Sequence, residues 1–247
     1  MNSISANLNI MIKAAEKASK VLIRDFGELE KLQVSSKGPA DFVTNSDKKV
    51  EKIIIEELTQ ARKKFSILSE EIGEVKNSDK DNCWIIDPID GTMNFLHGIP
   101  HFAISIALKT KKEIVSGLIF DPIKNEMFYA EKNNGAFLNN QRIRVSKKNK
   151  LNECLFATGG SNYEIVKDIP HRRTGCAALD MAYVASGRYD GYFQFNLNLW
   201  DIAAGIVIVK EAGGLINQID LNNYRNIKVL ASSPDIIDKL NKKLINF

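Results

Sequence analysis

The sequence predicts an α/β protein built from an N-terminal α+β half (residues 1–145) and a C-terminal α/β half (residues 146–247). Three observations support this prediction. The first sixty residues repeat apolar side chains at helical spacing. Residues 102–140 contain short apolar runs separated by tight-turn residues, which is typical of antiparallel strands. After residue 150, short strand patterns alternate with helical ones, as in α/β folds.

Two helices open the chain. In the first 26 residues, apolar side chains recur every three to four positions, so this segment is predicted to be an amphipathic helix of the fold (Leu8, Ile12, Ala15, Ala18, Leu22). Thr44 with Asp47 three residues later gives a capping signal for a second helix. Its apolar stripe comprises Val50, Ile53, Ile54, Leu58 and Ala61.

The rest of the N-terminal half is predicted to be strands, at residues 65–68, 83–87, 102–108, 115–120 and 127–130. Residues 102–108 alternate apolar with small or polar side chains, which predicts a half-buried strand. Turns are expected at 121–122, 133–135 and 139–140. In the C-terminal half we expect strands at 155–157, 192–195 and 228–232, and helices at 177–186, 202–212 and 234–245.

Composition excludes several classes of protein. The 247 residues are 44% hydrophobic and 26% charged, values of an ordinary globular protein, and the net charge of +4 is too weak to imply a nucleic-acid partner. No apolar run reaches the roughly 18–20 residues of a membrane span. The three scattered cysteines predict reduced thiols in a cytoplasmic protein (Cys83, Cys154, Cys176). The three histidines lack the spacing of a zinc site (His97, His101, His171).

The segment Ser146–Leu151 is the predicted boundary between the halves. Basic residues gather around it (Arg142, Arg144, Lys147, Lys148, Lys150). Such a cluster could contact RNA, but a solvated linker is favoured because no aromatic side chains interleave with the charges.

Residues 84–95 carry the clearest chemical signal. An apolar run ends on Asp87, Asp90 follows three residues later, and Gly91 and Thr92 open a predicted helix. Two carboxylates at a strand end, beside the N–H groups of a helix start, suit a divalent metal and a phosphate. The alternative is a buried strand that ends in an Asp-Pro turn with two solvated acids.

The stretch 84–95 resembles the signature of the inositol monophosphatase family, the Mg²⁺-dependent, lithium-sensitive phosphatases. Three other segments match the same family in the same order, at residues 41–47, 69–71 and 200–214. The resemblance therefore covers essentially the whole chain. It implies a five-layer α-β-α-β-α sandwich, a phosphoric monoester hydrolase that uses water as its nucleophile, two or three Mg²⁺ per subunit and a homodimer.

The resemblance also implies metal ligands. Glu70, Asp87 and the backbone C=O of Ile89 would bind the first metal, and Asp87, Asp90 and Asp201 the second, with Asp87 bridging the two. All of these ligands are oxygens, which Mg²⁺ prefers.

Catalytic roles follow from the same resemblance. Thr92 and Asp47 would hold the attacking water near the first metal, together with Glu70. For Asp47 the alternative is helix capping alone, and for Thr92 a plain first-turn position.

Substrate contacts are implied at Gly91, Thr92, Asp90 and Asp201, and at Gly175, Cys176 and Ala177, which resemble a family segment whose backbone contacts substrate hydroxyls. Cys176 stands where a hydroxyl residue is usual. A reactive thiol there has no visible histidine partner, so a small buried side chain is favoured. Gln194 stands where a substrate-binding glutamate is common; the alternative is a side chain at a strand end that faces away from the cleft. The stretch 158–171 is shorter than in typical members, which would alter part of the dimer contact.

The substrate implied is myo-inositol 1-phosphate or a similar polyol phosphate. Relatives in the superfamily act on 3′-phosphoadenosine 5′-phosphate, fructose 1,6-bisphosphate or histidinol phosphate, and these alternatives stay open. Some bacterial members act in RNA processing and transcription antitermination, so a regulatory protein is the rival interpretation.

Overall fold

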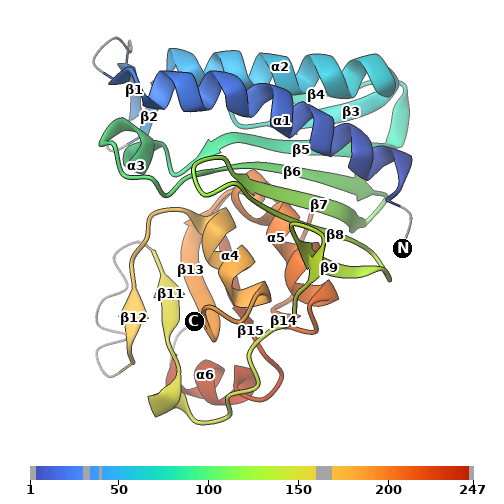
Figure 1. Ribbon diagram of the computed structural model, residues 1–247. Helices are drawn as coiled ribbons and strands as arrows, with labels where there is room; N and C mark the ends of the chain where they lie inside the picture. The colour runs from blue at the N-terminus through green and yellow to red at the C-terminus, as the bar shows by residue number, and fades with distance from the viewer. Residues whose placement is uncertain (1–3, 30–33, 39–40, 160–168, 245–247) are drawn as a thin grey trace.

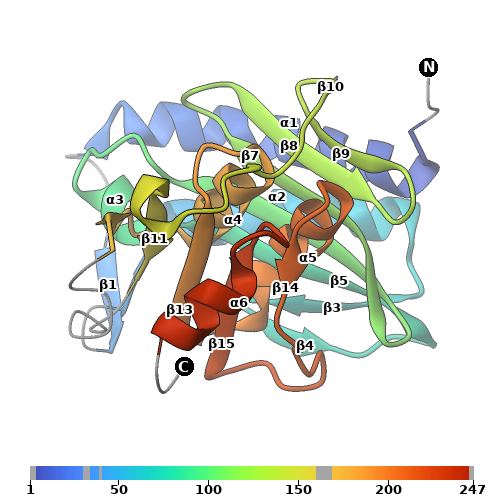
Figure 2. The ribbon, with the colours of Figure 1, turned by 90° about the horizontal axis from the view of Figure 1, so that it is seen from below.

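The computed structural model describes residues 4–29, 34–38, 41–159 and 169–244. Within them, helices and sheets stack in five layers, and the predicted α/β class is confirmed (Figure 1). Helices α1 (Ala6–Phe26) and α2 (Asn45–Ala61) cover one face of an eight-stranded sheet. Helices α4 (Ala177–Ala185) and α5 (Leu199–Glu211) separate this sheet from a five-stranded sheet, and α6 (Ile237–Lys243) covers the far face of the second sheet (Figure 2).

The eight-stranded sheet has the order β10-β9-β8-β7-β6-β5-β3-β4. Neighbours are antiparallel except β3 and β5, which are parallel. The strands are β3 (Phe65–Ser69), β4 (Gly73–Val75), β5 (Asp79–Asp90), β6 (Ala103–Thr110), β7 (Glu113–Asp121), β8 (Glu126–Glu131), β9 (Gly135–Leu138) and β10 (Gln141–Arg142). The short helix α3 (Thr92–Leu96) follows β5, and a separate antiparallel pair, β1 (Val34–Gly38) and β2 (Asp41–Thr44), precedes α2.

The five-stranded sheet has the order β12-β11-β13-β15-β14. β11 runs parallel to both neighbours, while β13, β15 and β14 pair antiparallel. The strands are β11 (Phe156–Thr158), β12 (His171–Arg172), β13 (Gly191–Leu197), β14 (Leu215–Ile216) and β15 (Ile227–Ser232).

The prediction of a half-buried strand at residues 102–108 was wrong. β6 is buried on both faces along Ala103–Leu108, because helices cover both sides of the sheet. Ile104 and Ile106 pack toward α1 and α2, whereas Ala103 and Ala107 pack toward α4 and α5. The small side chains match the close approach of α5: a Cβ added at Gly117, on neighbouring β7, would lie 2.6 Å from the Ala204 carbonyl oxygen.

Two helix starts differ from the predictions. α5 begins at Leu199 rather than residue 202, because Asn198 and Asp201 form a capping box there. α6 begins at Ile237 rather than residue 234, because residues 234–236 form a turn first. The side chain of Thr44, the predicted cap of α2, lies outside the described residues, as does most of the short segment 158–171.

The predicted linker is attached to the C-terminal half. The ammonium of Lys148 contacts the buried carboxylate of Asp190 at 3.0 Å, and Lys150 contacts Glu153 at 3.0 Å. Two charges of the basic cluster are therefore used within the chain. The largest buried cluster of side chains combines β5–β9 of the first half with α4 and α5 of the second, and the boundary at residue 145 stays a prediction.

Candidate active site

A pocket of about 260 Å³ lies between the end of β5, the start of α3, β13 and the first turn of α5. Four carboxylates from three separate stretches of the chain line it: Glu70, Asp87, Asp90 and Asp201. Ile89, Gly91, Thr92, Gly159, Gly175, Ala177, Gln194, Leu197 and Asn198 complete the lining. Of the predicted site residues, Asp47 and Cys176 are not among these lining residues.

A bulge at the end of β5 aims the first two acids into the pocket. Asp87 pairs with Ser105 of β6 and Asp90 with Ala103, so β5 has one more residue than its partner between these pairs. The Asp87 carboxylate accepts the Ile89 N–H (3.0 Å), and the Thr92 hydroxyl donates to the Ile89 carbonyl (2.9 Å). These bonds fix the turn that leads into α3.

Gly91 is required in this turn. Its φ of 94° lies in the left-handed region that favours glycine. A Cβ there would also lie 3.1 Å from the His101 carbonyl oxygen and 3.3 Å from the Cys176 Cβ.

Asp90 is held by the C-terminal half. Its Oδ2 accepts the N–H of Ala178 (2.6 Å), in the first turn of α4, and the thiol of Cys176 (3.0 Å). A carboxylate at a helix start is stabilised by the unpaired N–H groups there. Cys176 is buried and lies behind Asp90, not at the surface of the pocket.

Asp201 is held within its own helix. Its Oδ2 accepts the N–H of Asn198 at 2.8 Å, which closes the capping box of α5. The same residue therefore starts the helix and presents a carboxylate to the pocket.

Glu51 was missed by the sequence reasoning. This buried residue of α2 accepts hydrogen bonds from the Ser69 hydroxyl and the Glu71 N–H (3.0 Å), on either side of Glu70. It therefore holds the loop that delivers Glu70. A signal was present, because Glu51 lies on the apolar stripe formed by Val50 and Ile54, where a charged residue is unexpected.

The acids raise one another's pKa. Burial, and then the negative charges of Glu70, Asp90 and Asp201, raise the pKa of Asp87 well above its usual range. Burial, and then the charge of Asp90, do the same for the pKa of Asp201. Burial raises the pKa of Asp90 to about 6, against the opposing effect of its hydrogen bonds from Cys176 and Ala178. A cation between these groups would relieve the repulsion.

The chemistry of the donors fits a hard divalent cation. The pocket offers carboxylate oxygens, the ligands that Mg²⁺ prefers. Within the described ranges, no three acid, histidine or cysteine side chains form a compact ligand group as they stand. The hydrogen bonds given above end on a single oxygen of each of Asp87, Asp90 and Asp201.

The other predicted site residues lie as follows. Asp47 is buried in the first turn of α2, whereas Gln194, Gly175 and Ala177 line the pocket. Gln194 therefore does not face away from it. The Asn94 amide donates to the carbonyls of His101 and Thr174, both at 2.8 Å, and so joins the loop after α3 to the segment before α4.

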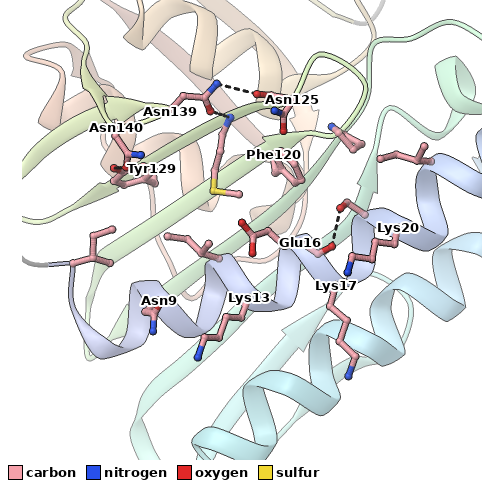
Figure 3. Close-up of a pocket in the computed structure, with 16 residues that line it drawn as sticks. Asn9, Lys13, Glu16, Lys17, Lys20, Phe120, Asn125, Tyr129, Asn139 and Asn140 are labelled. Carbon is pink, nitrogen blue, oxygen red and sulfur yellow. Dashed lines mark hydrogen bonds between the residues drawn. The ribbon is translucent and has the colours of Figure 1, made fainter.

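A second, larger groove of about 1060 Å³ lies elsewhere, between α1 and strands β7–β9 (Figure 3). Glu16 is the single acid among its described lining residues, and lysines and asparagines surround it. The groove therefore lacks the clustered carboxylates of a multi-metal site.

Solved structures share this fold. An extragenic suppressor protein suhB from Bartonella henselae superposes with a TM-score of 0.92 at 46% identity, over 98% of this chain and 99% of that one. Within the described residues no helix is both long and apolar enough to cross a membrane. The layered fold of this chain is therefore of the class found in that solved structure.

The family follows from the sequence comparisons. The model of the inositol monophosphatase family matches residues 5–246, and the chain belongs to this family. An inositol-1-monophosphatase of Rhizobium meliloti is 48% identical over 85% of this chain and 84% of its own length. A Nus factor SuhB of Haemophilus influenzae is 40% identical over 96% of this chain and 95% of its own length. The protein is a phosphoric monoester hydrolase.

Proposed function

We propose that this protein hydrolyses myo-inositol 1-phosphate or a similar small polyol phosphate in a Mg²⁺-dependent reaction with water as the nucleophile. The observation that carries the proposal is the set of four carboxylates, from three stretches of the chain, around one pocket beside the start of α3. The inositol-1-monophosphatases among the relatives support the choice of substrate.

Mg²⁺ ions, two or three per subunit, would be held by Glu70, Asp87 and the Ile89 carbonyl on one side, and by Asp87, Asp90 and Asp201 on the other. When bound, Mg²⁺ supplies positive charge that neutralises the phosphate and lowers the pKa of a water molecule.

The chain's own groups would orient the reactants. The Thr92 hydroxyl, aimed by its hydrogen bond to Ile89, and the carboxylates of Glu70 and Asp47 would hold the attacking water by accepting its hydrogen bonds, and one of the two carboxylates would take its proton. Backbone groups of Gly91 and Thr92 would contact the phosphate, and those of Gly175 and Ala177 the alcohol part. Such contacts hold water and phosphorus in the geometry of attack.

A phosphate-release assay over small phosphomonoesters, with and without Mg²⁺, tests this function. We expect Asp201→Asn to lower kcat by about 10²-fold or more, because it removes a charged ligand. Asp220→Asn, a change at an exposed turn, is the matched control and should leave turnover unchanged. Calorimetric titration with Mg²⁺ gives a second measure. Near-normal turnover and Mg²⁺ affinity in Asp201→Asn would refute the ligand assignment.

A second candidate function is favoured by relatives named Nus factor SuhB, which match almost the whole chain. In that case the protein would act in the cytoplasm as a regulatory partner of RNA or of the transcription machinery, and would keep its phosphatase site. Purification of the protein from its own cells distinguishes the two roles, since bound RNA or RNA polymerase would support regulation. We expect a homodimer in either case, which light scattering measures.

A further inference from the structure

Tyr192 and Gln194 lie two residues apart on β13, so their side chains project from the same face of the sheet. Gln194 lines the acid-lined pocket, while Tyr192 is fully buried behind it. The Tyr192 hydroxyl donates a hydrogen bond to the Gln194 Oε1 at 2.7 Å.

The amide of Gln194 also lies close to Gly159, the residue that follows the neighbouring strand β11. A Cβ added at Gly159 would lie 2.0 Å from Oε1, 2.4 Å from Cδ and 2.8 Å from Nε2 of Gln194. The amide group of Gln194 therefore occupies the space in which a side chain at position 159 would begin. Any larger residue at position 159 would displace it.

This arrangement fixes which end of the amide is used. Burial, and then the negative charges of Asp180, Asp90 and Asp201, raise the pKa of Tyr192 well above its usual range, so its hydroxyl keeps the proton that it donates. Oε1 accepts this hydrogen bond and is also the amide atom nearest the Cβ position of Gly159, whereas the NH₂ group at Nε2 offers two further donors to another partner. No described residue accepts a hydrogen bond from Nε2.

The NH₂ donor of Gln194 contrasts with the acids of the pocket. Carboxylates accept hydrogen bonds but cannot donate them, and four of them line the pocket. Gln194 adds a neutral group with a donor whose orientation is set. A substrate group that has a negative charge and no proton to give would make the stronger, charge-assisted bond with this donor.

We propose that Gln194, positioned by Tyr192, selects phosphomonoesters that carry a second anionic acceptor, such as another phosphate, over those that carry only hydroxyls. Gln194 is the specificity residue, and Tyr192 and Gly159 are positioning residues. The inference rests on the proposed phosphatase function and, within it, ranks small polyol bisphosphates above myo-inositol 1-phosphate.

The test uses a matched pair of substrates, myo-inositol 1-phosphate and myo-inositol 1,4-bisphosphate, which differ by one phosphate. The measured quantity is the ratio of kcat/KM for the bisphosphate to that for the monophosphate, at saturating Mg²⁺. Gln194→Glu, which exchanges the donor for a charged acceptor, should lower the ratio by about 5–30-fold. Gln194→Met, which removes the donor without adding charge, should lower it by about 5-fold.

The positioning role has its own variant and controls. Tyr192→Phe frees the amide to rotate and should lower the ratio by about 2–5-fold, through KM for the bisphosphate rather than kcat. Tyr129→Phe removes a similar hydrogen bond, 2.7 Å to Asn140, far from the pocket, and should leave the ratio unchanged. Gln218→Glu adds the same charge at an exposed site and should also leave it unchanged.

Each outcome is decisive. If the wild-type protein releases phosphate from neither substrate, the proposed function fails and the inference fails with it. If the wild type is active but the ratio is the same in all variants, the inference alone is wrong. If Gln194→Glu lowers the ratio and Gln194→Met does not, charge at this position and not the NH₂ donor determines the substrate preference. That result also overturns the inference. Thermal melting checks folding, and the Gln194 variants decide if Tyr192→Phe does not fold.

Discussion

Rising pH should destabilise the metal-free protein through Asp90. The pKa of this carboxyl is raised to about 6 in the fold, from an ordinary value of 3.8. A group whose pKa is higher in the folded state binds protons more tightly there, so it destabilises the fold once they are lost. The loss of stability therefore begins above about pH 4 and is complete once the pH has passed about 6.

The magnitude follows from the same two values. The difference between 3.8 and about 6 corresponds to about 3 kcal/mol, at 1.36 kcal/mol for each pH unit. In a domain of this size, 1 kcal/mol changes Tm by about 2–4 °C, so Asp90 alone should lower Tm by about 6–12 °C between pH 4 and pH 8. Asp87 and Asp201 act in the same direction, because their pKa values are also raised.

Melting temperatures of wild type and Asp90→Asn, in chelator at a series of pH values, measure this effect. Asparagine keeps an oxygen that can accept the Ala178 N–H, but its side chain does not titrate. We expect the Tm of Asp90→Asn to increase relative to that of the wild type as pH rises. Saturating Mg²⁺ should remove most of the effect of pH on this comparison.

Asp79→Asn is the control of opposite sign, because hydrogen bonds from Asn82 and Asp81 lower the pKa of Asp79. If Tm changes with pH in the same way in the wild type and in Asp90→Asn, the reasoning is refuted.

Further perturbations test the support of the acids. Glu51→Met should weaken Mg²⁺ binding about 10-fold, because the donors of Ser69 and Glu71 lose their acceptor, whereas Glu51→Gln should keep most of the affinity; equal affinity in all three proteins by calorimetry would contradict this role. Cys176→Ala should weaken Mg²⁺ binding about 3–10-fold, and Cys176→Ser should restore it. Unchanged Mg²⁺ affinity in Cys176→Ala would show that the thiol does not position Asp90. Ca²⁺ should compete with Mg²⁺ without supporting turnover, because it takes more ligands at longer distances, and Li⁺ should inhibit; full activity in Ca²⁺ alone would show that the geometry of the cation does not matter.

The sequence was sufficient for the first two helices and for the local structure around Asp87 and Asp90. Helical periodicity is a local property, so α1 and α2 were predicted within a few residues. The motif at 84–95 combines a strand end, two acids and a helix start in one short stretch, and the structure has β5 ending at Asp90 and α3 beginning at Thr92.

What could not be predicted depends on layers far apart in the sequence. The pattern predicts a half-buried strand at β6, because alternation of Ile with Ala or Ser resembles alternation of apolar with polar residues. Only the packing of α5 on the other face shows that small side chains are required there. Glu51 was passed over for a similar reason, since its partners, Ser69 and Glu71, lie about twenty residues away on another element.

The position of Asp90 shows how the two halves together make the site. This acid belongs to the eight-stranded sheet, yet its carboxylate is held by the first turn of α4, which packs on the five-stranded sheet. A shift of α4 relative to β5 by even 1 Å would lengthen the 2.6 Å bond to the Ala178 N–H beyond the range of a good hydrogen bond. Asp90 would then be a buried carboxylate with weaker support, and its pKa would rise further. The packing of the helix layer between the sheets therefore controls the charge in the pocket, and substitutions in α4 that never touch a substrate should still change the affinity for Mg²⁺.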